Sequence, residues 1–125
     1  MARIVFVDDD EELRDLTKTI LGKKGHSVLA FADAESAIQE IRIYKPDLIL
    51  MDIILPGMDG VEAIEKVREN PHFLYIPVIF LSGLVSGREK DIESTGIKIS
   101  GTNYKILGKP FDSNQLLEAI DSMLV

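Results

Sequence analysis

The sequence predicts an α/β domain in which a parallel β-sheet carries helices on both faces. Short apolar runs alternate along the chain with longer stretches whose apolar residues recur at helical spacing. Runs that are apolar at every position are typical of strands buried on both faces, and their alternation with helices is typical of parallel sheets. With 125 residues, 46% of them apolar, the chain can bury one core. We expect one domain, residues 1–125.

The N-terminal third of the chain predicts two strand–helix units. Residues 4–7 are continuously apolar and predict the first strand. The helix after them has leucine and isoleucine at helical spacing and ends near Gly25, a residue type favoured just past a helix end. Residues 26–31 predict the second strand. Asp33 can cap the second helix, which stops before Pro46 because the residue before a proline disfavours helical backbone angles.

The rest of the chain continues the alternation. Residues 48–51 predict a third buried strand, and a loop with Pro-Gly and Asp-Gly pairs leads to a third helix that closes at Asn70-Pro71. Residues 78–81 and 104–107 predict the fourth and fifth strands, with a short polar helix at residues 86–95 between them. Asp112, with Gln115 three positions later, has the spacing of a capping box and opens the last helix.

Charge and composition exclude several classes of function. The 14 lysines and arginines against 21 acids give a net charge of −7, which disfavours direct binding to nucleic acid or to an anionic membrane. The absence of cysteine excludes disulfides and thiolate chemistry. The apolar run near the N-terminus is too short for a signal peptide, and no run reaches membrane-spanning length. We expect a soluble, cytoplasmic protein.

Polar side chains follow the predicted strands where each one ends. The first strand is followed by Asp8 and Asp9, and the third by Asp52. The fourth is followed by Ser82 and the fifth by Lys109. Ligand sites of open parallel sheets form at the carboxyl ends of the strands, so we expect these side chains to meet at one edge. Three close carboxylates repel one another unless a cation lies among them, and an all-oxygen site suits Mg²⁺.

Four short motifs lie at these strand ends. They are Val7-Asp8-Asp9, the segment 51–60, Leu81-Ser82-Gly83 and Gly108-Lys109-Pro110-Phe111. Together, in this order and over the whole chain, they resemble the receiver domain of two-component response regulators. The resemblance implies a flavodoxin-like (βα)5 fold, which is a doubly wound five-stranded parallel sheet in the order 2-1-3-4-5.

The resemblance also implies roles. Asp52 is then the phosphoacceptor, which attacks a phosphohistidine on a sensor histidine kinase or a histidine phosphotransfer protein. Lys109 pairs with the phosphoryl group, and the Ser82 hydroxyl bonds a phosphoryl oxygen after transfer. Such a domain catalyses only its own phosphorylation and dephosphorylation, and it signals to a downstream protein target by changing its binding surface. The face between the fourth and fifth helices is where a homodimer could form.

The implied cofactor is Mg²⁺. Asp9 would bind the ion directly and Asp8 partly through water, while Asp52 and the main-chain carbonyl of Ile54 would complete the protein ligands. The acids after the first strand could instead only cap the following helix and complement its dipole. Asp10 can cap the helix while its two neighbours bind metal, so the two interpretations coexist.

Three features depart from the usual receiver pattern. The position three before the lysine, often aromatic, is Ile106, and Tyr104 shares its strand face. Signalling could therefore rely on Tyr104, or on Ser82 and its loop without an aromatic side chain that changes rotamer. The interval from the serine motif to the lysine is 27 positions and contains several glycines, so the fourth helix is expected to be short, displaced or mobile. Apolar Ile54 and Leu84 flank the acceptor, which predicts a slow loss of phosphate.

Three other functions fit parts of the sequence. A receiver-like module could bind proteins without phosphorylation, although it would not need all five site residues. A haloacid-dehalogenase-like phosphatase needs two acids two positions apart, as Asp8 and Asp10 are, but this chain continues with Glu11-Glu12 instead of the usual Gly-Thr. A flavodoxin would need a phosphate-cradling loop after the first strand. No role is assigned to His26 or His72.

Overall fold

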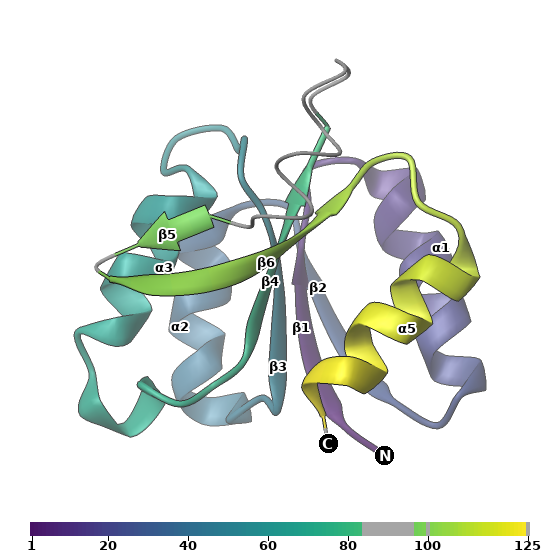
Figure 1. Ribbon diagram of the computed structural model, residues 1–125, viewed down its shortest axis with the longest axis horizontal. Coiled ribbons are helices and arrows are strands. Elements are labelled where there is room, and N and C mark those ends of the chain that lie inside the picture. The colour runs from purple at the N-terminus through teal and green to yellow at the C-terminus, as the bar shows by residue number, and fades with distance from the viewer. Residues whose placement is uncertain (84–96, 100, 125) are drawn as a thin grey trace.

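A sheet separates two helical layers in the computed structural model, which describes residues 1–83, 97–99 and 101–124 (Figure 1). Helices α1 (Glu11–Lys23) and α5 (Ser113–Met123) cover one face. Helices α2 (Ala34–Tyr44) and α3 (Gly60–Arg68) cover the other. A 3₁₀ turn, η1 (Pro71–Phe73), follows α3. The predicted cover on both faces is confirmed, while the helix expected at residues 86–95 lies outside the described residues.

The sheet has the strand order β2-β1-β3-β4-β6-β5. Its parallel part consists of β1 (Arg3–Val7), β2 (Ser27–Phe31), β3 (Leu48–Asp52), β4 (Val78–Ser82) and β6 (Thr102–Gly108). The predicted flavodoxin-like fold is confirmed. The order of the parallel strands is also the predicted one, with β6 in the place of the fifth strand.

One strand was not predicted. β5 (Ile97–Ile99) pairs antiparallel with β6 at the edge of the sheet, so the sheet is mixed and six-stranded instead of purely parallel and five-stranded. Three residues are too few to show a strand period. Gly101 lies in the turn between the two strands with a φ of 85°, a left-handed conformation that glycine adopts at little cost. The chain therefore reverses where the sequence indicated only a glycine-containing connection.

The strands are apolar because helices cover both of their faces. Every residue of β3 and β4 is buried. Along β1, Val5 and Val7 pack with α2 and α3, while Ile4 and Phe6 pack with α1 and α5, as the alternation of side chains along a strand requires. This rigid centre of the sheet fixes the carboxyl ends of β1, β3 and β4 relative to one another.

Aspartates begin the four α-helices that the structure describes. Asp10, Asp33, Asp59 and Asp112 each accept a hydrogen bond from a backbone N–H of the first turn. The predicted cap at Asp33 and the capping box of Asp112 with Gln115 are confirmed. None of the helices within the described residues is long and apolar enough to cross a membrane. Because the caps fix where α1, α3 and α5 begin, they also fix the loops that follow β1, β3 and β6.

Candidate functional site

Three carboxylates meet at the carboxyl edge of the sheet, which is the upper end of the view in Figure 1. Asp8 and Asp9 follow β1, and Asp52 ends β3. The two strands are neighbours, with Val7 opposite Met51. As a result, one carboxylate oxygen from each of the three aspartates lies within 4.8 Å of the others. Asp8 and Asp52 are buried, with 0% and 4% of their surface exposed, and Asp9 faces solvent.

Lys109 joins two of these carboxylates. Its Nζ lies 2.6 Å from Asp8 Oδ2 and 3.0 Å from Asp52 Oδ2. The backbone places the lysine there, because its N–H donates to the Ser82 carbonyl at 2.7 Å and extends the β4–β6 pairing. The peptide bond between Lys109 and Pro110 is cis. The amino group expected from the sequence therefore lies among the carboxylates of β1 and β3.

The charges of this cluster are not balanced. Burial raises the pKa of the Asp52 carboxyl above its ordinary 3.8, the Asp8 charge raises it further, and the hydrogen bond from Lys109 lowers it without reversing the shift. For Lys109, burial lowers the pKa, but the hydrogen bonds and charges of Asp8 and Asp52 outweigh it and raise the pKa above 10.5. Lys109 is thus a firmly held cation, and Asp52 an ionisable group whose charge the protein offsets only in part.

Ser82 and Ile54 lie on the segments next to Asp52. Ser82 is buried at the end of β4, one position beyond Leu81, the cross-strand partner of Asp52. The Ile54 N–H donates to Asp52 Oδ1 at 3.3 Å, so the backbone of the β3–α3 loop touches the carboxylate. The Ile54 side chain points outward, with 64% of its surface exposed. Leu84, expected to flank the same site, lies outside the described residues.

The sequence reasoning missed two residues that hold the site in place. Arg14 donates from Nη1 to the Asp8 carbonyl at 2.8 Å, which anchors the loop after β1 to α1. The N–H of Gly60 donates to the Ile53 carbonyl at 2.8 Å, and a Cβ at Gly60 would lie 2.9 Å from the carbonyl carbon of Asp52. The Asp-Gly pair at the start of α3 is the signal that could have identified Gly60. Arg14 gives no local signal, because its partner is a backbone atom.

Asp10 has a different task from its two neighbours. Its side chain caps α1 by accepting hydrogen bonds from the N–H groups of Glu12 and Leu13. Its own N–H donates to Asp8 Oδ1 at 3.0 Å. Asp10 therefore orients the Asp8 carboxylate, but its own carboxylate is not part of the group formed by Asp8, Asp9 and Asp52. A dehalogenase-like phosphatase would instead use Asp8 and Asp10 as its two acids.

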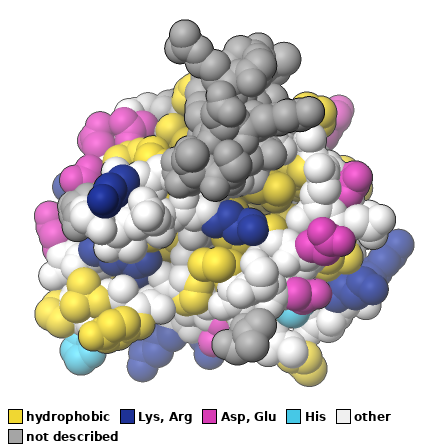
Figure 2. Space-filling view, viewed as in Figure 1, with side chains coloured by type: hydrophobic (Ala, Val, Ile, Leu, Met, Phe, Trp, Pro, Cys, Tyr) yellow, Lys and Arg dark blue, Asp and Glu magenta, His cyan; other side chains and the backbone are white. Residues whose placement is uncertain are grey.

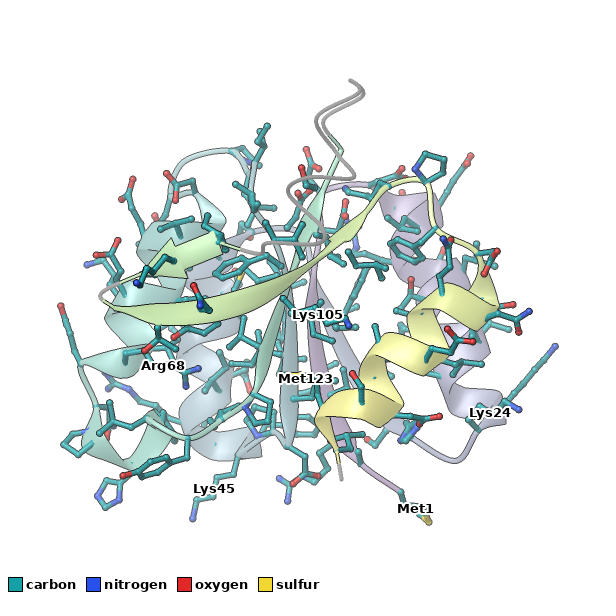
Figure 3. The ribbon with its side chains drawn as sticks, in the orientation of Figure 1. Met1, Lys24, Lys45, Arg68, Lys105 and Met123 are labelled. Atoms are coloured by element: carbon teal, nitrogen blue, oxygen red, sulfur yellow. The ribbon has the colours of Figure 1, made fainter. Side chains whose placement is uncertain are left out.

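Tyr104 lies away from the carboxylates. It packs in the same core cluster as Ile106, as its position on the strand predicted. Its hydroxyl accepts a hydrogen bond from Arg68 Nε at 3.1 Å, and its ring meets Phe80 edge-on with centroids 5.5 Å apart. Arg68, labelled in Figure 3, reaches from α3 and also donates to the carbonyls of Phe73 and Ile76. Tyr104 is thus fixed in a half-buried position between α3 and β4.

The donor set fits Mg²⁺. All three side chains offer carboxylate oxygens, the hard ligands that this ion prefers, and one of them is open to solvent. Such an ion usually keeps several waters and needs few protein ligands. Asp8, Asp9 and Asp52 could therefore hold it, together with a carbonyl of the β3–α3 loop.

Comparison with known proteins gives a consistent result. The family model described as the response regulator receiver domain matches residues 4–121. Protein PilH of Pseudomonas aeruginosa is 34% identical, over 99% of this chain and 98% of its own length. The transcriptional regulatory protein CseB of Streptomyces coelicolor is 31% identical over 97% of this chain, and this chain spans about half, 48%, of that relative. The solved structure of the Vibrio cholerae chemotaxis protein CheY4 has a TM-score of 0.83 and 26% identity, and the match covers 99% of both chains.

Proposed function

This chain belongs to the response regulator receiver domain family, and we propose that its Asp52 accepts a phosphoryl group from a histidine kinase or a histidine phosphotransfer protein. Receiver domains are signalling domains and not classical enzymes, so the reaction changes the protein itself. The observation that carries the proposal is the group of Asp8, Asp9 and Asp52 around Lys109. In this proposal residues 1–125 form one cytoplasmic receiver domain.

Phosphoryl transfer requires little covalent work from the protein. An Asp52 carboxylate oxygen attacks the phosphorus of the phosphohistidine, an O–P bond forms, the P–N bond breaks, and the electron pair stays on the imidazole nitrogen. Positioning and charge neutralisation supply most of the catalysis in such reactions. Mg²⁺ bound by Asp8, Asp9, Asp52 and the Ile54 carbonyl would neutralise charge on the phosphoryl oxygens. Lys109, already held beside Asp52, supplies a second positive charge.

The phosphorylated state would differ from the free state mainly in charge. The carboxylate gains a phosphoryl group with about one further negative charge and several acceptor oxygens. Ser82, buried beside the acceptor at the end of β4, would donate its hydroxyl to one of these oxygens. A shift of β4 and its neighbour β6 would then alter the surface that a downstream protein target binds, or the face through which two copies pair.

Intact-protein mass spectrometry after incubation with Mg²⁺ and acetyl phosphate tests the proposal. A single phosphoryl adduct that is stable in acid and labile in base is expected. Asp52→Asn should abolish it, and Asp59→Asn is the matched control because asparagine caps a helix as well as aspartate does. An adduct that persists in Asp52→Asn would place the acceptor elsewhere. No adduct under any condition would favour a receiver-like module that binds proteins without phosphorylation.

A further inference from the structure

A pocket lies at the opposite end of the molecule from the carboxylates. It has a volume of about 560 Å³ and lies between the end of α2 and η1. We call it the α2–η1 pocket; its main lining residues are Arg42, Lys45, Pro46, His72, Phe73 and Ile76. Pro46 and Ile76 precede β3 and β4, so the pocket is at the amino-terminal edge of the sheet. In Figure 3 Lys45 is accordingly at the lower end of the molecule.

The charged residues of the α2–η1 pocket are cations. Arg42 and Lys45 line it, and no carboxylate does so among the described residues. Among the described residues, the ion pairs are those of Lys109 with Asp8 and Asp52. Arg42 and Lys45 therefore have no acidic partner within that part of the chain. This is a local exception on a chain whose net charge is −7. Cations near a helix C-terminus also stabilise the helix. Lys23 and Lys24 have this effect at the end of α1, which lies away from the α2–η1 pocket.

Apolar side chains border the same cations. Phe73 and Ile76 form part of the pocket wall. On the segments that supply the lining, Tyr75 is 90% exposed and Ile43 75%. Figure 2 shows hydrophobic side chains gathered next to a histidine at the lower left, with Lys and Arg side chains nearby along the lower edge. A single exposed apolar residue needs no explanation, but exposed apolar residues that gather on one part of the surface mark an interaction site.

We propose that the α2–η1 pocket docks an acidic segment of a partner protein that carries an aromatic or aliphatic side chain beside its carboxylates. The carboxylates would face Arg42 and Lys45, and the apolar side chain would lie against Phe73 and Ile76. Charge complementarity selects an acidic occupant over a basic one. Because the pocket and Asp52 lie at opposite edges of the sheet, this partner leaves the phosphoacceptor edge open, and its binding does not require phosphorylation.

Backbone-amide NMR titration of the whole chain with a synthetic peptide, acetyl-Glu-Asp-Trp-Asp-Glu-amide, tests the proposal. Saturable shifts confined to residues 42–46 and 70–76 are expected. The double variant Arg42→Glu/Lys45→Glu should weaken binding about tenfold or more, because two attractions become repulsions. Lys23→Glu/Lys24→Glu is the matched control, since it changes the net charge equally at another helix end, and it should bind like the wild type. Replacing the peptide's tryptophan by serine should also weaken binding.

Other results would overturn the proposal. Equal loss in the two double variants would show that only overall charge matters. Unsaturable shifts, or shifts outside residues 42–46 and 70–76, would show that the peptide does not occupy the pocket. The same shifts with inorganic phosphate alone would indicate a bare anion site. The same shifts on raising the protein concentration without peptide would identify a second copy of the chain as the occupant.

Discussion

Gly60→Ala is the substitution that tests most directly how the fold positions the phosphoacceptor. An added Cβ would lie 2.9 Å from the carbonyl carbon of Asp52 and 3.0 Å from Met51 Cγ, with the Asp52 carbonyl oxygen closer still. Unstrained carbon contacts are about 3.5 to 4.0 Å, so the start of α3 must move away from β3 by roughly 1 Å. That movement would also strain the hydrogen bond from the Gly60 N–H to the Ile53 carbonyl.

Neither side of this contact can yield easily. Met51 and Asp52 belong to the fully buried strand β3, and α3 is held by the Asp59 cap. Overpacking costs about 1 to 3 kcal/mol where side chains can adjust, and here the obstacle is backbone, so we expect about 3 kcal/mol of lost stability in urea unfolding. A displacement of about 1 Å should also slow phosphorylation of Asp52 about 100-fold.

Gly22→Ala provides the control for this prediction. Gly22 lies within α1, and a Cβ there would meet nothing within 4 Å. The same chemical change should therefore stabilise the protein, by about 0.5 to 1 kcal/mol, through helix propensity alone. If Gly60→Ala unfolded within about 1 kcal/mol of the wild type, α3 would be free to shift, and the claim that Gly60 fixes the Asp52 backbone would be wrong.

Three further predictions concern charges and hydrogen bonds. In Mg²⁺-free solution Asp52→Asn should stabilise the fold at neutral pH. Burial raises the pKa of Asp52 above 3.8 in the folded chain, so the charged carboxylate lowers the stability of the wild type as the pH rises above 3.8. Urea unfolding should show this gain vanishing below about pH 3.8, where the folded and unfolded chains both carry a protonated Asp52; a gain independent of pH would contradict the argument. Arg68→Ala should cost about 2 to 3 kcal/mol in the same assay, since its guanidinium donates to three oxygens, whereas Lys66→Ala on the exposed face of α3 should cost less than about 0.5 kcal/mol. Asp9→Asn should weaken Mg²⁺ binding about tenfold or more in titration calorimetry, with little change in stability because the side chain is exposed; wild-type affinity would remove Asp9 from the metal site.

The sequence predicted the parts of the fold that depend on long, regular patterns. Three fully apolar runs gave β1, β3 and β4, because a strand covered on both faces can carry few polar residues. The centre of β6 was predicted from a run that is apolar except for Lys105. β5 was not predictable in this way, since three residues paired at an edge show no period. Its position depends on pairing with Thr102–Tyr104, a contact that local sequence does not encode.

The site was predictable to the extent that topology dictates it. Once parallel strands are assigned, residues that end neighbouring strands must meet, so the sequence alone predicts that Asp8, Asp9 and Asp52 lie together. Lys109 could be placed at the same edge but not paired, because its contact with both Asp8 and Asp52 depends on the path of its side chain. Arg14 could not be found, since it acts on a backbone carbonyl and any residue could supply that acceptor.

The ionic cluster costs the fold stability. Asp8 and Asp52 are almost fully buried, and two carboxylates against one ammonium leave a negative charge in a place of low polarity. The raised pKa of Asp52 follows from this, since the ion pair with Lys109 offsets its burial only in part. Well-packed apolar side chains in place of a buried ionic cluster often stabilise a protein. Stability and phosphorylation should therefore move in opposite directions at Asp52: the asparagine variant gains the first and loses the second, a combination that an aspartate kept for structure alone would not produce.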